Sequence, residues 1–530
     1  MKSQIPLALS AAIAITAVLG GTAWADGSDN QSVESVSANR HVESVSAGPS
    51  LFAGCTVGAS PGAVAQIGSE AEPWVAVNPR NPRRTIASYQ QDRWSAAGGS
   101  HGLGTSYSND GKHFTKSALP FDTCAGGADH GLKYERASDV WVSYGPDGVA
   151  YASGLVFNVS DPSTAVAAAT SSDDGKSWTD IQPIIQDTSA EFGNDKNSVT
   201  ADPNHPGYAY QVWDRLDQTT SSLNGPAFIS ITHDHGRTWT KPAVFVDTSV
   251  TPNTQTIGNI VVADARTGSL YDFFDSISYT DPAGTTTSDV HFAFVKSTDQ
   301  GRTWSKPTAI TPDTSVAELD PNAPTDAGKA LRAGANLLSA AIDPKTGKLY
   351  ATYEGSDFSA GKFDQIEMVT SSDGGATWTK PMLMSQVPTA PAFTPSIVVD
   401  HDGNVALTYK DLRNLKPGDT TTVPTAEFLL TFARGDEACP GERQISPVFD
   451  WLKAPYATWG HFLGDYDGLA VVGTKQFRPL FAVTTNHPSD SSDVYSGVFT
   501  MNPKGAPKSA VLATKANPSG QYVHGRRGRI

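Results

Sequence analysis

The eight residues Ser171-Ser172-Asp173-Asp174-Gly175-Lys176-Ser177-Trp178 contain the pattern that decides the fold. The pattern is Ser/Thr-x-Asp-x-Gly-x-Ser/Thr-Trp, with close copies at residues 232–239, 297–304 and 371–378 and a worn copy at 107–114. Its aspartate can accept hydrogen bonds from the backbone of a turn, its glycine permits a positive φ, and its tryptophan can pack under the turn. Each copy therefore predicts the turn of a β-hairpin.

The rest of the chain indicates an all-β fold built from repeated units. Short β-rich runs alternate with turns rich in Gly, Pro, Asn and Asp. The units open with apolar runs at residues 73–79, 140–144, 198–203, 259–264, 337–344, 396–400 and 468–473. A four-stranded unit of roughly 60 residues has the size of a propeller blade. We therefore predict one β-propeller domain over residues 51–505, favour seven blades, and keep six as the alternative.

The seventh unit lacks an obvious outer strand. Residues 51–68 are the candidate for this strand, which would close the ring and remove an exposed sheet edge.

The repeated pattern resembles the Asp-box, or BNR repeat, of the sialidase-like β-propellers. In that family the box is structural and performs no chemistry. The resemblance covers most of residues 70–500 at the level of repeats. Sialidases themselves have six blades, so the seven openings counted above depart from the family.

Composition and the two ends of the chain indicate export. A formal net charge of −15 over 530 residues argues against nucleic-acid binding. Residues 1–25 have the charge, apolar run and small residues of a signal peptide cleaved near Ala25. Residues 26–50 indicate a disordered leader, and residues 506–530 a flexible basic tail. We expect a secreted, extracellular or periplasmic monomer without a membrane span.

The chain has three cysteines, so at most one intrachain disulfide can form. We prefer Cys55–Cys124, which would tie the N-terminal segment to the first repeat and leave Cys439 over. The sequence has no Cys/His spacing typical of structural zinc and no acidic loop that matches a known calcium motif. We therefore assign no metal ligand and expect no cofactor, and the sequence leaves open whether the Asp-rich turns hold calcium.

Blade geometry predicts which residues share a face. Successive strands alternate in direction, so residues before each first strand and after each second strand meet on the face opposite the boxes. The cationic side chains at these positions are Arg93, Arg136, Lys196, Arg215, Arg332 and Arg413. Arginine presents a planar fork that suits a carboxylate, which predicts an acidic ligand. Alternatively, these arginines pair with Asp92, Asp214 and Asp411 as bridges between blades.

The family resemblance implies roles for several of these residues. Sialidases clamp the substrate carboxylate with three arginines and use a tyrosine activated by a glutamate, with an aspartate as general acid/base. By position in the repeat, the resemblance implies Arg93, Arg215 and Arg413 as the clamp, Tyr466 as nucleophile, and Glu135 or Glu354 as its partner. The further candidates for proton transfer are His101, His461 and Asp465. The family's Phe/Tyr-Arg-Ile-Pro segment is absent, since Glu72-Pro73-Trp74 stands in its place.

Three functions compete on this evidence. The first is a carbohydrate-active enzyme of the exo-sialidase type that hydrolyses terminal acidic sugars from an acidic glycan or oligosaccharide. The second is a uronate-specific lyase, because β-elimination also needs a cation, a base and an acid. The third is a non-catalytic glycan-binding propeller, which the fold alone does not exclude.

Overall fold

A computed structural model describes residues 42–501 except 220, 221, 283, 285, 317, 318, 488 and 489. The predicted signal peptide, most of the predicted leader and the predicted basic tail lie outside the described residues. Within them the regular structure is β-strand and short 3-10 turn. None of the helical segments described is long and apolar enough to cross a membrane.

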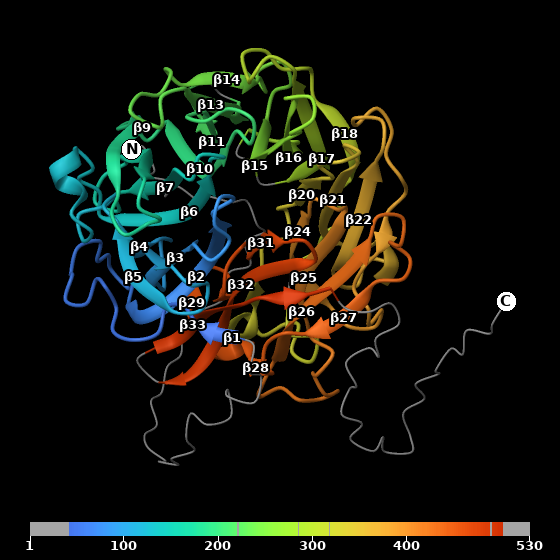
Figure 1. Ribbon diagram of the computed structural model, residues 1–530. Coiled ribbons are helices and arrows are strands. Elements are labelled where there is room, and N and C mark those ends of the chain that lie inside the picture. The colour runs from blue at the N-terminus through green and yellow to red at the C-terminus, as the bar shows by residue number, and fades with distance from the viewer. Residues whose placement is uncertain are drawn as a thin grey trace, which may run out of the picture.

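The strands form successive antiparallel meanders arranged around a centre, as in a β-propeller (Figure 1). The first three sets comprise β2 (Ala65–Val77), β3 (Thr85–Trp94), β4 (Ser100–Ser108) and β5 (Phe114–Leu119); β6 (Arg136–Tyr144), β7 (Ala150–Phe157), β8 (Thr164–Ser171) and β9 (Thr179–Asp187); and β10 (Phe192–Ala201), β11 (Ala209–Asp217), β13 (Ala227–Thr232) and β14 (Ala243–Val246). The next two comprise β15 (Thr254–Ala263), β16 (Leu270–Tyr279), β17 (Thr287–Ser297) and β18 (Thr308–Pro312); and β20 (Ser339–Ile342), β21 (Leu349–Gly355), β22 (Gln365–Ser371) and β23 (Met382–Leu383).

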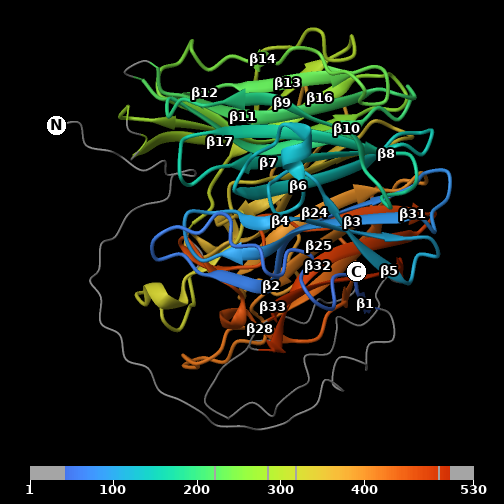
Figure 2. The same cartoon turned by 90° about the vertical axis from the view of Figure 1, so that its left-hand side faces the viewer.

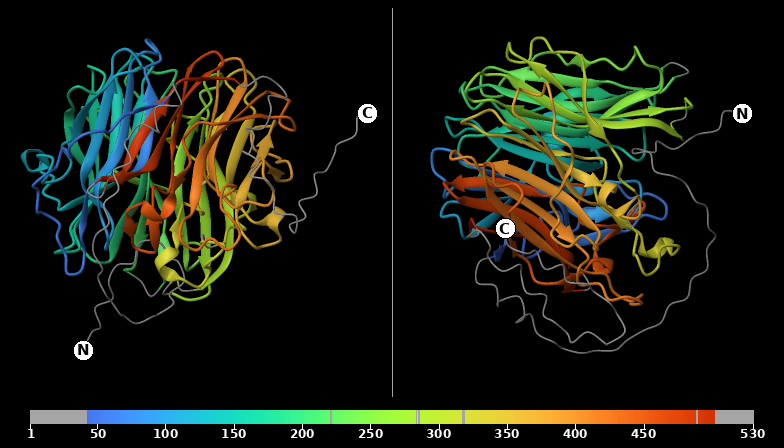
Figure 3. Two further views of the ribbon diagram at one scale, coloured as in Figure 1. Left: turned by 90° about the horizontal axis from the view of Figure 1, so that it is seen from below. Right: turned by 90° about the vertical axis from the view of Figure 1, so that its right-hand side faces the viewer.

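The last sets lie beside the first (Figures 1 and 3). They comprise β24 (Ala392–Val399), β25 (Asn404–Asp411), β26 (Pro424–Ala433) and β27 (Gly441–Gln444), with β28 (Phe449–Asp450) on β26; and β31 (Gly468–Gly473), β32 (Gln476–His487) and β33 (Asp490–Gly497), with β34 (Phe499–Thr500) on β32. The remaining strands are β1 (Val42–Ser44), β12 (Asn224–Gly225), β19 (Leu331–Arg332), β29 (Tyr456–Ala457) and β30 (Gly460–Phe462). The 3-10 turns are η2 (Gly127–His130), η3 (Ala327–Lys329), η4 (Asp357–Ser359) and η5 (Trp451–Lys453).

The all-β propeller fold is confirmed, whereas the number of blades stays a prediction. Neighbouring sets merge into larger sheets at two places, through the pair Ser100–Ala137 and through the parallel pairing of β12 with β15. Apolar residues between adjacent sheets form the core; one large cluster packs Trp451 among residues from β19 and from the segment between β24 and β34. A second view shows the sheets lying side by side (Figure 2).

The strand that completes the last set comes from a different segment than expected. β1 pairs antiparallel with β33, Val42 opposite Gly497 and Ser44 opposite Tyr495. This corrects the prediction that residues 51–68 supply the strand, and it brings residues 42–50 out of the predicted leader and into the fold. Side chains alternate between the two faces of a strand. Val45, directly after β1, is 3% exposed and packs in a core cluster with Val494, which holds the N-terminal segment against β33.

Residues 51–64 instead form turns and loops that lie against the first set, and residues 65–68 begin β2. Gly54, Gly58 and Gly62 adopt positive φ values, which an extended strand does not use. The segment is tied down by a disulfide between Cys55 and Cys124, which confirms the predicted pairing. Cys439 is unpaired and exposed.

The Asp-box turns join the third and fourth strands of their sets, as predicted. In one of them Asp234 accepts hydrogen bonds from Thr238 N at 2.9 Å, Thr238 Oγ1 at 2.7 Å and Thr232 Oγ1 at 3.0 Å. Gly236 has a φ of +79°. These bonds close the turn within eight residues, which is why the pattern is readable in the sequence. Of the box tryptophans, Trp178 is buried and Trp239 is only half-buried.

Candidate functional site

Buried charges gather at the centre of the ring, on or beside several of the innermost strands. Lys196 Nζ lies 3.2 Å from Glu72 Oε1, 3.0 Å from Asp139 Oδ1 and 2.7 Å from Asp465 Oδ2. Arg332 grips the same Asp465 with two bonds, Nε to Oδ1 at 3.1 Å and Nη2 to Oδ2 at 2.6 Å. We call Lys196, Glu72, Asp139, Asp465 and Arg332 the Lys196 cluster.

Backbone distortion aims three of these side chains at the centre. Glu72, Asp139 and Lys196 have φ values of +52°, +50° and +44°, and each sits in a register shift of its strand. A bulge with a left-handed residue re-aims a side chain that regular pleating would direct into a neighbouring sheet. The strain is tolerated because the side chains are held by the ion pairs of the cluster.

The carboxyl groups of the Lys196 cluster differ in pKa. Burial raises the pKa of Glu72 to about 7, although Lys196 acts to lower it. Burial also acts to raise the pKa of Asp465, but Arg332 and Lys196 outweigh it and hold that pKa well below its usual range. Burial alone would lower the pKa of Lys196, but its three carboxylate neighbours raise it well above normal. The site thus holds one carboxyl group that titrates near neutrality beside one that stays ionised.

Arg93 completes this region from β3. Its guanidinium lies 4.7 Å from the centre of the Phe462 ring, and that of Arg332 lies 4.4 Å from the same ring. Arg93 Nη1 donates to Gln90 Oε1, while Gln90 Nε2 donates to Glu72 Oε2. Among the described residues Arg93 makes no ion pair with a carboxylate, and its Nε has no hydrogen-bond partner. Burial and repulsion from Arg332 lower the pKa of Arg93 to about 10, which leaves it cationic at neutral pH.

Aromatic side chains form the other side of the cluster. Tyr466 meets Trp141 edge-on at 5.2 Å and Trp74 edge-on at 6.1 Å, and these two tryptophans stack on each other at 3.4 Å. Lys196 Nζ lies 5.7 Å from the Tyr466 ring centre. Burial, followed by the charges of Glu72, Asp139 and Asp465, raises the pKa of Tyr466 well above normal. The Tyr466 hydroxyl donates to the Val140 carbonyl at 3.3 Å, so it stays protonated.

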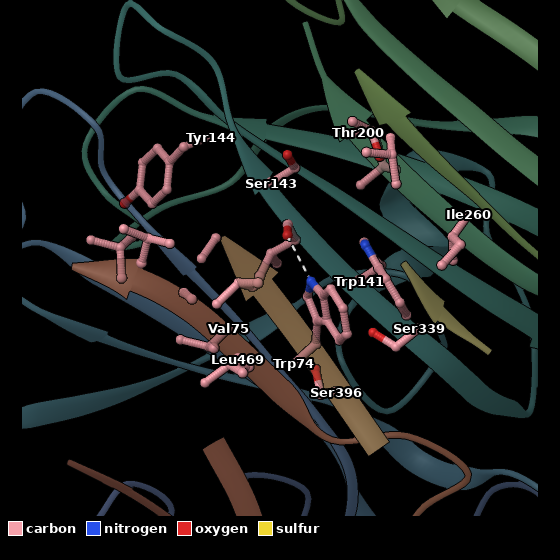
Figure 4. Close-up of a pocket in the computed structure, with 18 of the residues that line it drawn as sticks. Trp74, Val75, Trp141, Ser143, Tyr144, Thr200, Ile260, Ser339, Ser396 and Leu469 are labelled. Atoms are coloured by element: carbon pink, nitrogen blue, oxygen red, sulfur yellow. Dashed lines mark hydrogen bonds between the residues drawn. The ribbon is translucent and has the colours of Figure 1, made fainter. Parts of the chain in front are cut away.

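A cavity of about 330 Å³ runs along the centre beyond these tryptophans (Figure 4). All seven first strands line it: β2, β6, β10, β15, β20, β24 and β31. Its lining residues follow the cluster on the same strands, Trp74 two residues after Glu72 and Trp141 two residues after Asp139. The cavity therefore lies toward the box-bearing end, and the charged layer lies toward the end where the site is predicted.

The opposite side of the cluster is covered by a short sheet of β19, β30 and β29. It carries Phe462, whose ring contacts the guanidinium groups of both Arg93 and Arg332. Trp459, in the turn between β29 and β30, lies 5.4 Å from the Arg332 guanidinium and is 39% exposed. His461 faces two carbonyl oxygens, Ala454 O at 3.0 Å from Nδ1 and Gly328 O at 3.2 Å from Nε2. His461 thus ties this cover to two chain segments.

The predicted site residues divide into two groups. The structure brings together Arg93, Lys196, Arg332, Asp465 and Tyr466. Three other predicted arginines are engaged away from the cluster: Arg136 with the carbonyls of Gly58, Ala96 and Gly98, Arg215 with Asp187, and Arg413 with Asp411 and Glu442. The alternative of bridges between blades is met only in part: Arg413 pairs with Asp411 but within its own set, and Arg215 reaches the preceding set through Asp187 and not Asp214.

The remaining predicted catalytic residues also lie outside the cluster. His101 is 2% exposed, and its Nδ1 lies 3.1 Å from Asp92 Oδ2. Glu135 accepts hydrogen bonds from Val159 N and Ser160 N, which caps a turn. Glu354 accepts from Thr394 N at 2.7 Å, which supports the bulge of β24. Their catalytic roles stay predictions without a geometric link to Lys196.

Several members of the site were missed from the sequence, namely Asp139, Gln90, Phe462 and Trp459. For Asp139 a signal was present: Glu72-Pro73-Trp74 and Asp139-Val140-Trp141 share the spacing acid-x-Trp at equivalent places in two units. Phe462 and Trp459 have no repeat equivalent, because they lie in an insertion before β31.

Comparisons with known proteins found only distant likenesses. No family model and no curated sequence matches this chain. Similar solved structures include an α-L-arabinanase from Penicillium chrysogenum at 12% identity and TM-score 0.42, over 83% of this chain and 99% of that chain. A Hadza microbial sialidase has 13% identity and TM-score 0.44, over 80% and 75%. An α-L-arabinofuranosidase from Fusarium graminearum has 13% identity and TM-score 0.43, over 69% and 94%. At these values the likeness assigns no activity to this chain.

Proposed function

We propose that this protein is a secreted carbohydrate-active enzyme that binds a terminal acidic sugar at the Lys196 cluster and hydrolyses its glycosidic bond. The observation that carries the proposal is Arg93, a buried guanidinium without a carboxylate partner among the described residues. The other predicted arginines have their charge or their donors satisfied by the chain. A ligand carboxylate would supply the missing anion.

Two carboxyl groups of the cluster have the ionisation that glycoside hydrolysis needs. Glu72, with a pKa of about 7, can carry a proton to a leaving group near neutral pH. Asp465 stays ionised and can act as nucleophile or stabilise positive charge on the sugar. Both contact the same lysine nitrogen, so the two carboxyl groups are close neighbours, and a short separation of the two carboxyl groups is typical of retaining enzymes. Tyr466, kept protonated, suits the nucleophile role less well than Asp465.

Ligand entry in this proposal requires the cover to shift. The Phe462 ring packs against the guanidinium groups of both Arg93 and Arg332 and so takes up space beside them. Displacement of the β29–β30 hairpin would open that space, with the exposed Trp459 offering an aromatic face to a sugar ring.

Export is supported by the disulfide, which is typical of oxidising compartments.

The test compares acidic and neutral ligands on wild type and on Arg93→Gln. By calorimetry, Arg93→Gln should weaken binding of a terminal acidic glycan roughly 10- to 150-fold, since one charge-assisted contact is lost. Binding of the same glycan with its carboxylate reduced to an alcohol should be weak and should change little. Arg84→Gln is the control, because Arg84 is a half-exposed arginine paired with Asp174 on the box-bearing side.

Glu72→Gln then tests the chemistry. It should lower kcat far more than it changes binding, with release of free sugar as the readout. A product with the absorbance of an unsaturated uronate would show that the reaction is elimination and not hydrolysis. Glycan binding without turnover would favour the third function, a non-catalytic glycan-binding propeller. Equal affinity of wild type for acidic and neutral glycans would refute the carboxylate site itself.

A further inference from the structure

A second group of carboxylates lies where the ring closes. Glu70 is on β2 of the first set, and Asp490 and Asp493 are on β33 of the last set. One carboxylate oxygen from each lies within 4.8 Å of the other two. We call these three residues the Glu70 cluster. The N-terminal strand β1 also pairs with β33, so three parts of the chain meet here.

The Glu70 cluster contains oxygens that the protein leaves without a partner. Glu70 is 1% exposed, and its Oε1 accepts from Gln91 Nε2 at 2.6 Å. Its Oε2 has no hydrogen-bond partner, and neither has the buried Oδ1 of Asp490. A buried carboxylate oxygen without a partner is costly, because it has lost water and gained nothing in return. Glu70 therefore brings to the cluster a buried carboxyl group with one oxygen that has no hydrogen-bond partner.

The nearby cations do not neutralise the group directly. No lysine or arginine among the described residues lies within ion-pair distance of the three carboxylates. Lys116 is a neighbour, but its Nζ donates to the carbonyls of Ser46, Gly48 and Pro49 at 3.1, 3.0 and 2.5 Å. Those bonds secure the N-terminal segment beside the cluster.

The electrostatics of the group agree with this geometry. Burial, followed by the charge of Asp493, raises the pKa of Glu70 well above normal. Burial and Asp493 also raise the pKa of Asp490 to about 7. Burial raises the pKa of Asp493, with Ser46 and Lys116 acting to lower it. Three carboxyl groups thus resist being ionised together unless a further positive charge is present.

We infer that the Glu70 cluster is a binding site for a calcium-type divalent cation that fastens the closure of the ring. Two oxygens that ligate one Ca²⁺ at about 2.4 Å lie no more than about 4.8 Å apart, which the three carboxylates satisfy. Calcium prefers carboxylate and carbonyl oxygens and accepts irregular geometry, whereas Mg²⁺ demands a near-octahedral shell and retains its waters. A cation here joins the first set to the last across more than four hundred residues of sequence.

The consequence is a stabilisation that depends on metal concentration. The three carboxylates come together only in the closed ring, so the cation binds the folded chain in preference to the unfolded one. The site is separate from the Lys196 cluster, and its test does not depend on any enzymatic activity.

The experiment measures the melting temperature of the full chain after chelation, then with added CaCl2. We expect Ca²⁺ to raise the Tm by several degrees in a saturable way, and MgCl2 at the same concentration to raise it less. Calorimetry should show one calcium site per chain. Glu70→Gln should lose both the binding and the Tm response. Glu191→Gln, which changes an exposed glutamate elsewhere, should keep both.

Three outcomes would overturn the inference. They are no Tm change and no heat with Ca²⁺, an equal Tm rise in NaCl of the same ionic strength, and full calcium binding by Glu70→Gln. If Glu70→Gln does not fold, Asp493→Asn takes its place, because Asp493 is less buried than Glu70. Asp493→Asn should weaken calcium binding at least 10-fold, and unchanged affinity would contradict the proposed ligand set.

Discussion

The Lys196 cluster and the Glu70 cluster each bring three carboxylates together, but the chain places cations only in the first. Lys196 contacts Glu72, Asp139 and Asp465, and Arg332 adds a bidentate bond. In the Glu70 cluster no lysine or arginine of the described residues forms an ion pair with the carboxylates. Two acidic groups of similar composition therefore differ in how far neighbouring cations compensate their charge, and neutralising a carboxylate should affect stability differently in each.

The largest expected effect is removal of the central cation. Lys196→Met should lower the free energy of unfolding by about 3–5 kcal/mol, because it leaves buried carboxylates without their partner. Urea unfolding followed by fluorescence measures the change. The control is Lys345→Met, whose ion pair with Asp402 is largely exposed and should be worth less than about 1 kcal/mol. Similar losses in the two variants would mean that the cluster is not held by Lys196.

Neutralising one aspartate in each cluster should change the stability of the protein in opposite directions. Asp465→Asn should destabilise the protein by a few kcal/mol, since it leaves Lys196 and Arg332 with excess positive charge. Asp493→Asn should stabilise the chelated protein at neutral pH, because it relieves repulsion on Glu70 and Asp490. Thermal unfolding in the presence of a chelator compares them. Destabilisation by both substitutions would show that the second group is already compensated.

The third prediction concerns how completely Lys196 keeps its neighbouring carboxyl groups ionised, and its measured change per pH unit is the smallest of the three. The folded-state pKa of Glu72 is raised to about 7 by burial, so the folded chain holds this proton more tightly than the unfolded chain. Its stabilising contribution is full below the unfolded pKa of about 4.3 and is lost as pH rises through 7. Glu72 should thus contribute a slope of up to about 1.4 kcal/mol per pH unit in that window.

Glu72→Gln should flatten the dependence of unfolding free energy on pH between 5 and 7.5. Urea midpoints across this range give the comparison, and Glu191→Gln should keep the wild-type slope. Identical slopes for wild type and Glu72→Gln would mean that Glu72 is ionised throughout and that Lys196 fully offsets its burial.

The sequence predicted the local architecture well because the determining contacts are local. The hydrogen bonds of each Asp-box span at most four residues, as between Asp173 and Ser177. The disulfide could be predicted because three cysteines allow few pairings. The closing strand was placed wrongly, since pairing of residue 42 with residue 497 depends on how the ring ends meet.

The site was predicted only in part for the same reason. Repeat position placed Arg93, Lys196 and Asp465 on one rim, and the structure brings them together. Repeat position also selected Arg136, Arg215 and Arg413, which find partners within the chain. Whether an arginine is paired depends on side chains from neighbouring sheets, and the repeat pattern does not report them.

By itself the sequence determined the hairpins, the all-β propeller and the rim on which charged residues gather, because each follows from bonds or alternation within a few residues. Only the tertiary structure decided that Lys196 stands between Glu72, Asp139 and Asp465, and that Glu70 meets Asp490 and Asp493 at the seam. The physical reason is distance along the chain. These groups come from segments up to several hundred residues apart, and their separation in space is set by ring closure and by bulges that no local pattern encodes.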